Sequence, residues 1–151
     1  MTGGKLKEKV VVEKASWVRR MLQQLRQLPI EDEQTFLADP RNPAAAESFL
    51  RRAIEALLDL GRHVLARAFG VAVVEYKEIA IQLGAHGVIL PGQQKLLREI
   101  AGYKNRLVHF YDEIGPEELY RIICDGTGDI ADILDAILEW VNEHPQLIDR
   151  S

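Results

Sequence analysis

The sequence predicts an all-α protein, a bundle of four main helices with short additional helices. Two observations support this fold class, and the length bears on the number of domains. Apolar residues recur at spacings of three and four along several long segments, which is the period of an amphipathic helix. No segment alternates apolar and polar residues over the length of a strand. The 151 residues fit one domain, 1–151, whose core we expect to cover about residues 10–143.

The N-terminal half contains two long predicted helices. Residues 10–28 carry apolar residues on one side and arginines and glutamines on the other, and Pro29 ends this helix. The next residues, 30–43, are rich in proline and charge, which is typical of a connection, with a helical turn around 33–37. Residues 44–69 then predict the second long helix, which has the same apolar periodicity.

Shorter elements lie between the second long helix and the central one. Gly61, in the middle of the second helix, allows another helix to approach closely. Residues 71–74 have the composition of a strand but no partner of similar character, so we expect a loop. Residues 76–83 predict a short helix, and the glycine-rich residues 84–92 predict a turn.

The central helix follows this turn and is expected to close at residues 112–115. Its predicted buried stripe consists of Leu96, Ile100, Tyr103, Leu107 and Phe110. Beyond it, residues 116–124 predict a short helix, which the glycines within residues 126–128 break. Asp129 is the predicted N-cap of a last helix that ends before Pro145, and the tail after it is expected to fray.

Polar side chains share one arc of the central helix and form the first candidate site. Successive residues turn by about 100°, so Lys104, Asn105, His109, Tyr111 and Asp112 face the same broad direction. Imidazole titrates near neutral pH, so His109 could act as an acid or base or contact a phosphate. The alternative from the residues alone is a histidine that only bonds to a neighbouring helix.

A second pair of polar residues lies on the second long helix. Asp59 and His63 are four residues apart and point the same way, which would allow metal binding, orientation of a second imidazole, or an ordinary carboxylate–histidine pair. Only Glu55 could add a nearby ligand, and this does not fill a zinc sphere. We therefore assign no metal and no cofactor. Cys124, the single cysteine, is expected to be a small core residue rather than a nucleophile.

Composition limits the cellular setting and the partners. The formal net charge of −4 argues against non-specific binding of nucleic acid over the whole surface, but it leaves room for a local basic site. No apolar run is long enough to span a bilayer, and the charged N-terminus does not resemble a signal peptide. A single cysteine excludes an intramolecular disulfide, which suits a reducing compartment. We expect a cytoplasmic protein with no membrane partner.

The candidate arc resembles a known signature. Residues 101–111 resemble the HEPN superfamily, specifically the HepT-like toxins, whose motif reads Arg-Asn-x-x-x-His-x-Tyr. Asn105, His109 and Tyr111 match it in identity and spacing, and Lys104 stands where the motif has arginine. The resemblance extends over about residues 10–141. It includes the second long helix, with the pattern Ala53-Ile54-Glu55-x-x-x-Asp59-x-x-x-His63, and Asp112-Glu113 after the motif.

This resemblance implies a HEPN-like helical bundle with ribonuclease activity. The protein would be the metal-independent RNA endonuclease of a toxin–antitoxin pair, with RNA as its substrate. A homodimer or higher oligomer would place two motif helices beside one cleft. The implied catalytic residues are His109, Lys104 and Asn105. A nucleotidyltransferase antitoxin would neutralise the toxin by adding AMP to the motif tyrosine, here Tyr111.

Three further residues are implied only as supporting ones: Asp59, His63 and Arg106. Arg106 cannot simply replace the motif arginine, because it is about 200° from Lys104 around the helix. We expect it to form an ion pair or to line the edge of the cleft.

Two alternatives to a working nuclease stay open. Lysine keeps the charge of arginine but lacks its planar, bidentate fork, so Lys104 would suit a catalytically impaired helical adaptor that binds RNA or a partner. The second alternative is a bundle that serves only for dimerisation.

Overall fold

The computed structural model describes residues 5–109 and 114–150, without the side chains of residues 108 and 109. Its long helices are α1 (Glu8–Arg26), α3 (Arg41–Phe69), α5 (Pro91–His109) and α6 (Pro116–Asn142). Its short elements are β1 (Leu6–Lys7), α2 (Glu33–Ala38), α4 (Tyr76–Ala85), the 3-10 helix η1 (Pro145–Leu147) and β2 (Ile148–Asp149). The prediction of an all-α bundle with four main helices and shorter ones is therefore confirmed.

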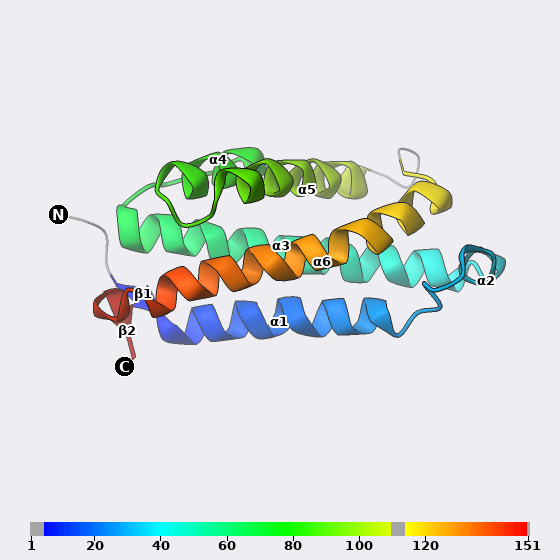
Figure 1. Cartoon of the computed structure of the whole chain (residues 1–151), viewed down its shortest axis with the longest axis horizontal. Helices are drawn as coiled ribbons and strands as arrows, with labels where there is room; N and C mark the ends of the chain where they lie inside the picture. The colour runs from blue at the N-terminus through cyan, green and yellow to red at the C-terminus, as the bar shows by residue number, and fades with distance from the viewer. Residues whose placement is uncertain (1–4, 110–113, 151) are drawn as a thin grey trace.

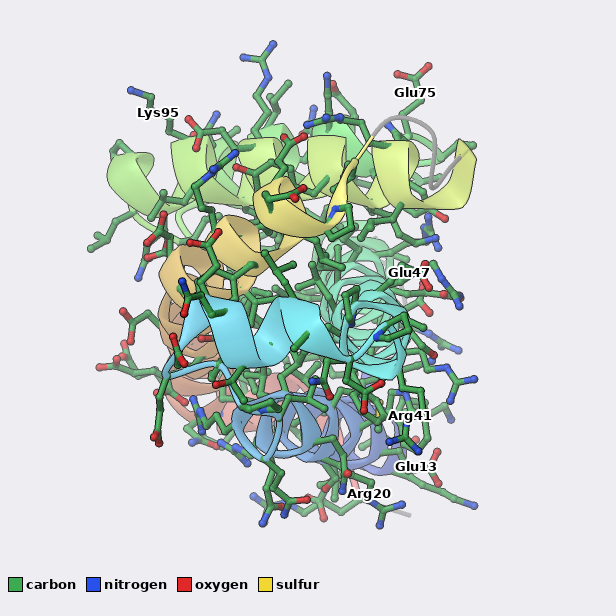
Figure 2. The ribbon with its side chains drawn as sticks, turned by 90° about the vertical axis from the view of Figure 1, so that its right-hand side faces the viewer. Glu13, Arg20, Arg41, Glu47, Glu75 and Lys95 are labelled. Carbon is green, nitrogen blue, oxygen red and sulfur yellow. The ribbon has the colours of Figure 1, made fainter. Side chains whose placement is uncertain are left out.

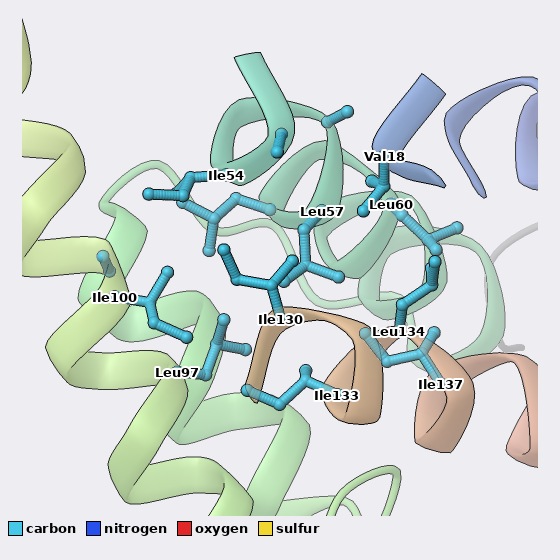
Figure 3. Close-up of a cluster of buried hydrophobic side chains, with 14 of the residues drawn as sticks. Val18, Ile54, Leu57, Leu60, Leu97, Ile100, Ile130, Ile133, Leu134 and Ile137 are labelled. Atoms are coloured by element: carbon cyan, nitrogen blue, oxygen red, sulfur yellow. The ribbon is translucent and has the colours of Figure 1, made fainter. Parts of the chain in front are cut away.

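The helices form layers around α3 and α6 (Figure 1). Helix α1 packs along α3 on one side, and the neighbouring helices α4 and α5 lie on the opposite side. Figure 2, which looks along the length of the bundle, shows α5 and α1 at opposite edges of the molecule. Helix α6 lies between these edges and contacts α3, α5 and α1. Side chains from all four long helices therefore meet in one hydrophobic core, with α3 and α6 at its centre (Figure 3).

The close approach expected at Gly61 is present. A Cβ atom at this position would lie 2.9 Å from Leu83 Cδ1 and 3.0 Å from Ile79 Cγ2. Both contacts are tighter than ordinary packing, so a side chain at position 61 would require Leu83 and Ile79 to move. Helix α3 ends at Gly70, whose φ of 67° is the left-handed conformation that commonly caps a helix C-terminus. The stretch from residue 71 to 74 has no regular structure, as predicted.

The break predicted at residues 126–128 is wrong, because α6 is continuous from Pro116 to Asn142. The buried stripe of α6 passes straight through the glycines, and Thr127 is part of it. A Cβ at Gly126 or Gly128 would meet nothing within 4 Å, so neither glycine marks a close approach. Two helical glycines cost roughly 2 kcal/mol relative to alanine, and burial of the long apolar stripe on both sides outweighs this. Asp129 therefore lies inside a helix and does not cap one.

The buried face of α5 differs from the predicted stripe. Its buried members among the described side chains are Leu97, Ile100, Ala101, Lys104 and Leu107. Leu96 and Tyr103 are only partly buried, and Phe110 lies outside the described residues. The face is thus rotated toward α3 and α4, which both pack against α5. As a consequence, Lys104 belongs to the buried face.

The two ends of the chain are joined, so the predicted frayed tail is wrong. Strands β1 and β2 are parallel, with Leu6 opposite Ile148 and Lys7 opposite Asp149. Leu6 is fully buried, and the Lys7 ammonium lies 3.2 Å from the Asp149 carboxylate. These contacts join residues more than 140 apart, and local sequence patterns do not reveal them.

No helix in the described part of the chain is both long and apolar enough to cross a membrane.

Candidate functional site

The motif residues lie on the C-terminal half of α5. Asn105 and His109 are four residues apart, and His109 is the last residue of the helix that the structure describes; most of the predicted closure at 112–115 lies outside the described residues. Four residues rise about 6 Å along a helix and return to nearly the same side of it, so the two positions form one row. The His109 side chain and the whole of Tyr111 lie outside the described residues. The described part of the site is therefore Lys104, Asn105 and their surroundings.

Lys104 is enclosed rather than exposed. Its residue is 5% exposed, and its ammonium lies 5.3 Å from the centroid of the Tyr76 ring. The nearest carboxylate is that of Glu55 on α3, 3.9 Å from the ammonium and itself half-exposed. A cation over an aromatic face is stabilised most when water is excluded. The predicted shared arc is therefore divided, because Lys104 faces inward while Asn105 is exposed.

Tyr76 contacts a second cation, Arg62 of α3. The Arg62 guanidinium carbon lies 5.8 Å from the Tyr76 ring centroid. The same side chain donates hydrogen bonds to the carbonyl oxygens of Val73 (3.2 Å) and Val74 (3.3 Å), and it pairs with Asp59 at 3.1 Å. Arg62 thus holds the loop that leads into α4 and, with it, the position of Tyr76.

Sequence reasoning did not identify Arg62 or Tyr76 as part of the site. Arg62 reads as one of several arginines on a solvated helix face, because its carbonyl partners lie 11 and 12 residues further along the chain. Tyr76 reads as the start of a short helix. The only sequence signal is the irregular segment between two helices, which requires some side chain to satisfy its carbonyl groups.

Asn105 opens onto a pocket between α5 and the start of α4. The pocket has a volume of about 370 Å³ and is lined by Val74, Glu75, Tyr76, Lys77 and Asn105. The Tyr76 hydroxyl makes no hydrogen bond within the described part of the chain. The Asn105 amide likewise has no partner among residues 5–109 and 114–150. Both polar groups are therefore available to a ligand in this pocket.

Arg106 forms an ion pair, which is one of the two roles expected for it. Its guanidinium and the Glu118 carboxylate of α6 make two parallel hydrogen bonds of 2.7 and 2.8 Å. This arrangement lowers the pKa of Glu118 below its ordinary value, chiefly through the hydrogen bonds from Arg106. The pair joins α5 to α6 just before the C-terminal end of the motif helix.

Asp59 and His63 do not form the expected carboxylate–histidine pair. Asp59 contacts Lys14 at 3.4 Å and Arg62 at 3.1 Å, and so belongs to the network behind Tyr76. His63 instead accepts a hydrogen bond from the backbone N–H of Lys7 through Nε2, at 3.0 Å. Burial lowers its pKa, and the positive charges of Arg67 and Lys7 add to this. His63 therefore supports the paired chain ends.

Cys124 is exposed, with its sulfur 3.7 Å from the carbonyl oxygen of Ile30, so its predicted place in the core is wrong. Among the described residues, no three His, Cys, Asp or Glu side chains are grouped as they would be around a metal ion.

Comparison with known proteins identifies the family. The family model described as "Ribonuclease HepT-like" matches residues 18–137, which is most of the chain and includes the motif through His109 and Tyr111. The chain belongs to the HepT-like family. The resemblance seen in the sequence is thereby confirmed.

A curated nuclease is similar to this HepT-like protein in sequence, and a solved HEPN toxin is similar to it in fold. It is 26% identical over 117 residues to the tRNA nuclease HepT of Aphanizomenon flos-aquae, covering 77% of this chain and 80% of that protein. A solved structure of a tri-AMPylated Shewanella oneidensis HEPN toxin in complex with MNT antitoxin has a TM-score of 0.78 at 18% identity. That alignment covers 86% of this chain and 97% of the toxin.

The Bacillus subtilis protein YutE, a cytosolic protein of unknown function, has a similar fold. Its TM-score is 0.77 at 18% identity, and the alignment covers 97% of this chain and 98% of YutE. At this identity the two solved structures establish a shared fold.

Proposed function

We propose that this HepT-like protein is a cytoplasmic, metal-independent RNA endonuclease that acts as a dimer or higher oligomer. The observation that carries the proposal is the family match over residues 18–137, which contains Asn105 and His109 one turn apart on α5. The tRNA nuclease HepT is a relative over a similar length, which supports RNA as the substrate. Asn105 lines an open pocket, which supports a site reached from solvent.

The proposed chemistry needs only groups that the chain itself supplies. His109 takes the proton from an RNA 2′-hydroxyl as its oxygen attacks the neighbouring phosphorus, or gives a proton to the departing 5′-oxygen. The new bond joins O2′ to phosphorus and the P–O5′ bond breaks, so the products carry a 2′,3′-cyclic phosphate and a 5′-hydroxyl. Asn105 donates to a phosphate oxygen. In a dimer, the two copies of His109 could divide the roles of base and acid.

Lys104 has a different role from that of an exposed motif arginine. Because its ammonium lies under Tyr76 and beside Glu55, it cannot reach outward as a bidentate phosphate ligand in this arrangement. Its charge instead stabilises the developing negative charge from behind the Asn105 pocket, where water does not screen it fully. We therefore assign Lys104 as a positioning and electrostatic residue.

The test is cleavage of RNA by the purified protein in the presence of a chelator. Replacing a general acid or base lowers rates by roughly 100- to 10,000-fold, and this is the expected result for His109→Ala. His144→Gln, a change in a histidine after α6 that lies outside the motif, is the control and should cleave like the wild type. Equal cleavage by wild type and His109→Ala would remove His109 from the mechanism.

A nucleotidyltransferase antitoxin is the proposed partner. Transfer of AMP to Tyr111 would place an anion two residues after His109, where it repels RNA. Incubation with the candidate antitoxin and ATP should therefore add mass in AMP units and stop cleavage. Tyr111→Phe should prevent the mass gain, whereas Tyr103→Phe on the same helix should not. Undiminished labelling of Tyr111→Phe would refute the assignment.

One observation favours a second candidate, an RNA-binding adaptor without turnover. Lys104 replaces the motif arginine and is 5% exposed, so the site lacks an exposed cation at this position. An adaptor would bind an RNA oligonucleotide as tightly as a nuclease but leave it intact. Binding without cleavage by the wild type, and no gain of cleavage in Lys104→Arg, would support this candidate over the nuclease.

A further inference from the structure

We propose that the pocket lined by residues 74–77 and Asn105 is a subsite for an RNA backbone phosphate, with Lys77 as its main contact. This inference rests on the proposed function in one respect, because it takes RNA as the ligand. It adds two residues, Lys77 and Tyr76, that the motif does not include. The phosphate held there belongs to a nucleotide next to the one that is cleaved.

The position of Lys77 follows from the packing of α4 beside α5. Its Cε atom lies 3.8 Å from the place that a Cβ would take at Gly102 of α5. Gly102 has no side chain to occupy this space, so the stem of Lys77 lies against α5 at this position. Gly102 is three residues before Asn105. Lys77 is exposed and forms no ion pair within the described residues. Its ammonium is therefore available to a ligand.

The groups around the pocket match the chemistry of a phosphodiester. Lys77 offers an ammonium, Tyr76 a hydroxyl and Asn105 an amide N–H, and phosphate oxygens accept from all three. Behind Tyr76, the cations of Arg62 and Lys104 lie 5.8 and 5.3 Å from its ring centroid. They fix the ring and add positive potential on the inner side of the pocket, which is partly offset by Asp59, the partner of Arg62, and by Glu55, 3.9 Å from Lys104. An anion is thus the ligand that the donors and the charges favour.

One carboxylate lines the pocket itself and opposes the charge of Lys77. Glu75 also lines the pocket, is exposed, and points outward at the edge of the molecule that carries α5 (Figure 2). Its negative charge weakens attraction for a phosphate without filling the pocket. Removal of the Glu75 charge should therefore strengthen RNA binding, whereas removal of the Lys77 charge should weaken it.

The distance to His109 determines which step the subsite affects. Asn105 lies one turn before His109, a rise of about 6 Å along α5. A phosphate at the pocket is therefore the neighbour of the reacting phosphate, and the two N–H groups of the Asn105 amide can serve one phosphate each. Loss of the contact should raise KM and the dissociation constant for RNA, with a smaller effect on kcat.

The experiment measures binding of a single-stranded RNA oligonucleotide in a His109→Ala background, so that the RNA stays intact, over a range of salt concentrations. Lys77→Ala should weaken binding by about 5- to 10-fold in low salt. It should also reduce the slope of log K against log salt by about 0.7, the value for one phosphate contact on a single strand. Glu75→Gln should strengthen binding by about 2-fold, and Tyr76→Phe should weaken it by a similar factor.

Lys95→Ala is the matched control. Lys95 is an exposed lysine of α5 that does not line the pocket, and Figure 2 shows it pointing outward from the same edge as Glu75. Its removal should leave binding and salt slope nearly unchanged. The same effect from Lys77→Ala and Lys95→Ala would overturn the subsite, as would a complete absence of RNA binding. RNA that is bound but never cleaved by the wild type would refute the nuclease alone, and the binding measurements would still decide the subsite.

Discussion

At the scale of single residues, Lys104 shows how a charge can lie on the buried face of a helix. Its methylene stem packs with the core, while its ammonium lies over the Tyr76 ring and 3.9 Å from Glu55. A long amphipathic side chain allows this, because the stem and the charged end have different surroundings. The charge is therefore retained beneath the Asn105 pocket, where the Tyr76 ring and the Glu55 carboxylate offset part of the cost of its desolvation.

Replacement of this charge by an apolar side chain of similar length tests its role. Lys104→Met should keep the packing of the stem and leave thermal unfolding within a few degrees of the wild type. Cleavage should fall by about 10-fold, less than the roughly 100- to 1,000-fold expected for a donor in direct contact. Single-turnover cleavage and a melting curve are the two measurements. Unchanged cleavage by a folded Lys104→Met protein would contradict the electrostatic role.

The Arg106–Glu118 pair leads to a prediction about pH. Its lowered pKa means that Glu118 stays ionised in the folded protein at a pH where the unfolded chain binds a proton. The pair therefore stabilises the fold above about pH 4.5 and loses this effect as the pH falls further. Glu118→Gln should reduce the free energy of unfolding by about 0.5 kcal/mol at pH 7, because both side chains are partly exposed.

Urea unfolding of wild type and Glu118→Gln at pH 7 and pH 3.5 measures this difference. The two proteins should differ at pH 7 and converge at the lower pH. A difference that persists at pH 3.5 would mean that the charge of Glu118 is not its cause.

At the scale of elements, the glycines inside α3 and α6 affect packing differently. Gly61 permits the contact between α3 and α4, because a Cβ there would meet Leu83 at 2.9 Å. Gly126 and Gly128 have no neighbour within 4 Å of such a Cβ, and neither has a positive φ. The first glycine is required by packing, whereas the other two only add conformational freedom to the unfolded chain.

Alanine substitutions separate the two cases. Gly128→Ala should raise the free energy of unfolding by about 0.5–1 kcal/mol, because alanine favours the helix and restricts the unfolded chain. Gly61→Ala should lower it by about 1–3 kcal/mol, because Leu83 and Ile79 must move. Denaturant unfolding measures both. A stabilising Gly61→Ala would show that α4 can shift without cost, and a destabilising Gly128→Ala would show that α6 needs flexibility there.

At the scale of the whole molecule, β1 and β2 hold the two ends of the chain against α3. His63 is one link between them and the bundle, since its Nε2 accepts the Lys7 backbone N–H. This bond requires the unprotonated form at Nε2. Burial, Arg67 and Lys7 lower the His63 pKa in the folded protein. Below about pH 6.5, His63 in the unfolded chain therefore binds a proton more readily than His63 in the folded protein.

Acidification should therefore weaken the attachment of the chain ends. The stabilisation from His63 is complete above about pH 6.5 and is lost as the pH falls through its lower folded pKa. His63→Gln keeps an acceptor that does not titrate, and should show a smaller loss of stability between pH 8 and pH 5.5. Urea unfolding midpoints at both values measure this. Equal losses in the two proteins would exclude His63 as the group responsible.

Much of the fold was predictable because helical periodicity is local. The first two long helices and the short helix α4 agree with their predicted segments to within a few residues, because apolar spacing, Pro29 and Gly70 act on neighbouring residues. The motif residues of α5 were recognisable for the same reason. Composition misled at residues 126–128, where burial of a stripe on both sides outweighed two glycines.

The sequence by itself determined the helical class, the family and the residues 104–111 as the candidate site, because each depends on the spacing of residues close together in the chain. Only the tertiary structure decided that Lys104 faces inward, that Arg62 and Tyr76 lie behind the Asn105 pocket, and that the chain ends pair. These features depend on contacts between different helices and between distant ends. Such contacts are set by how helix faces pack together, which the period of a single helix does not specify.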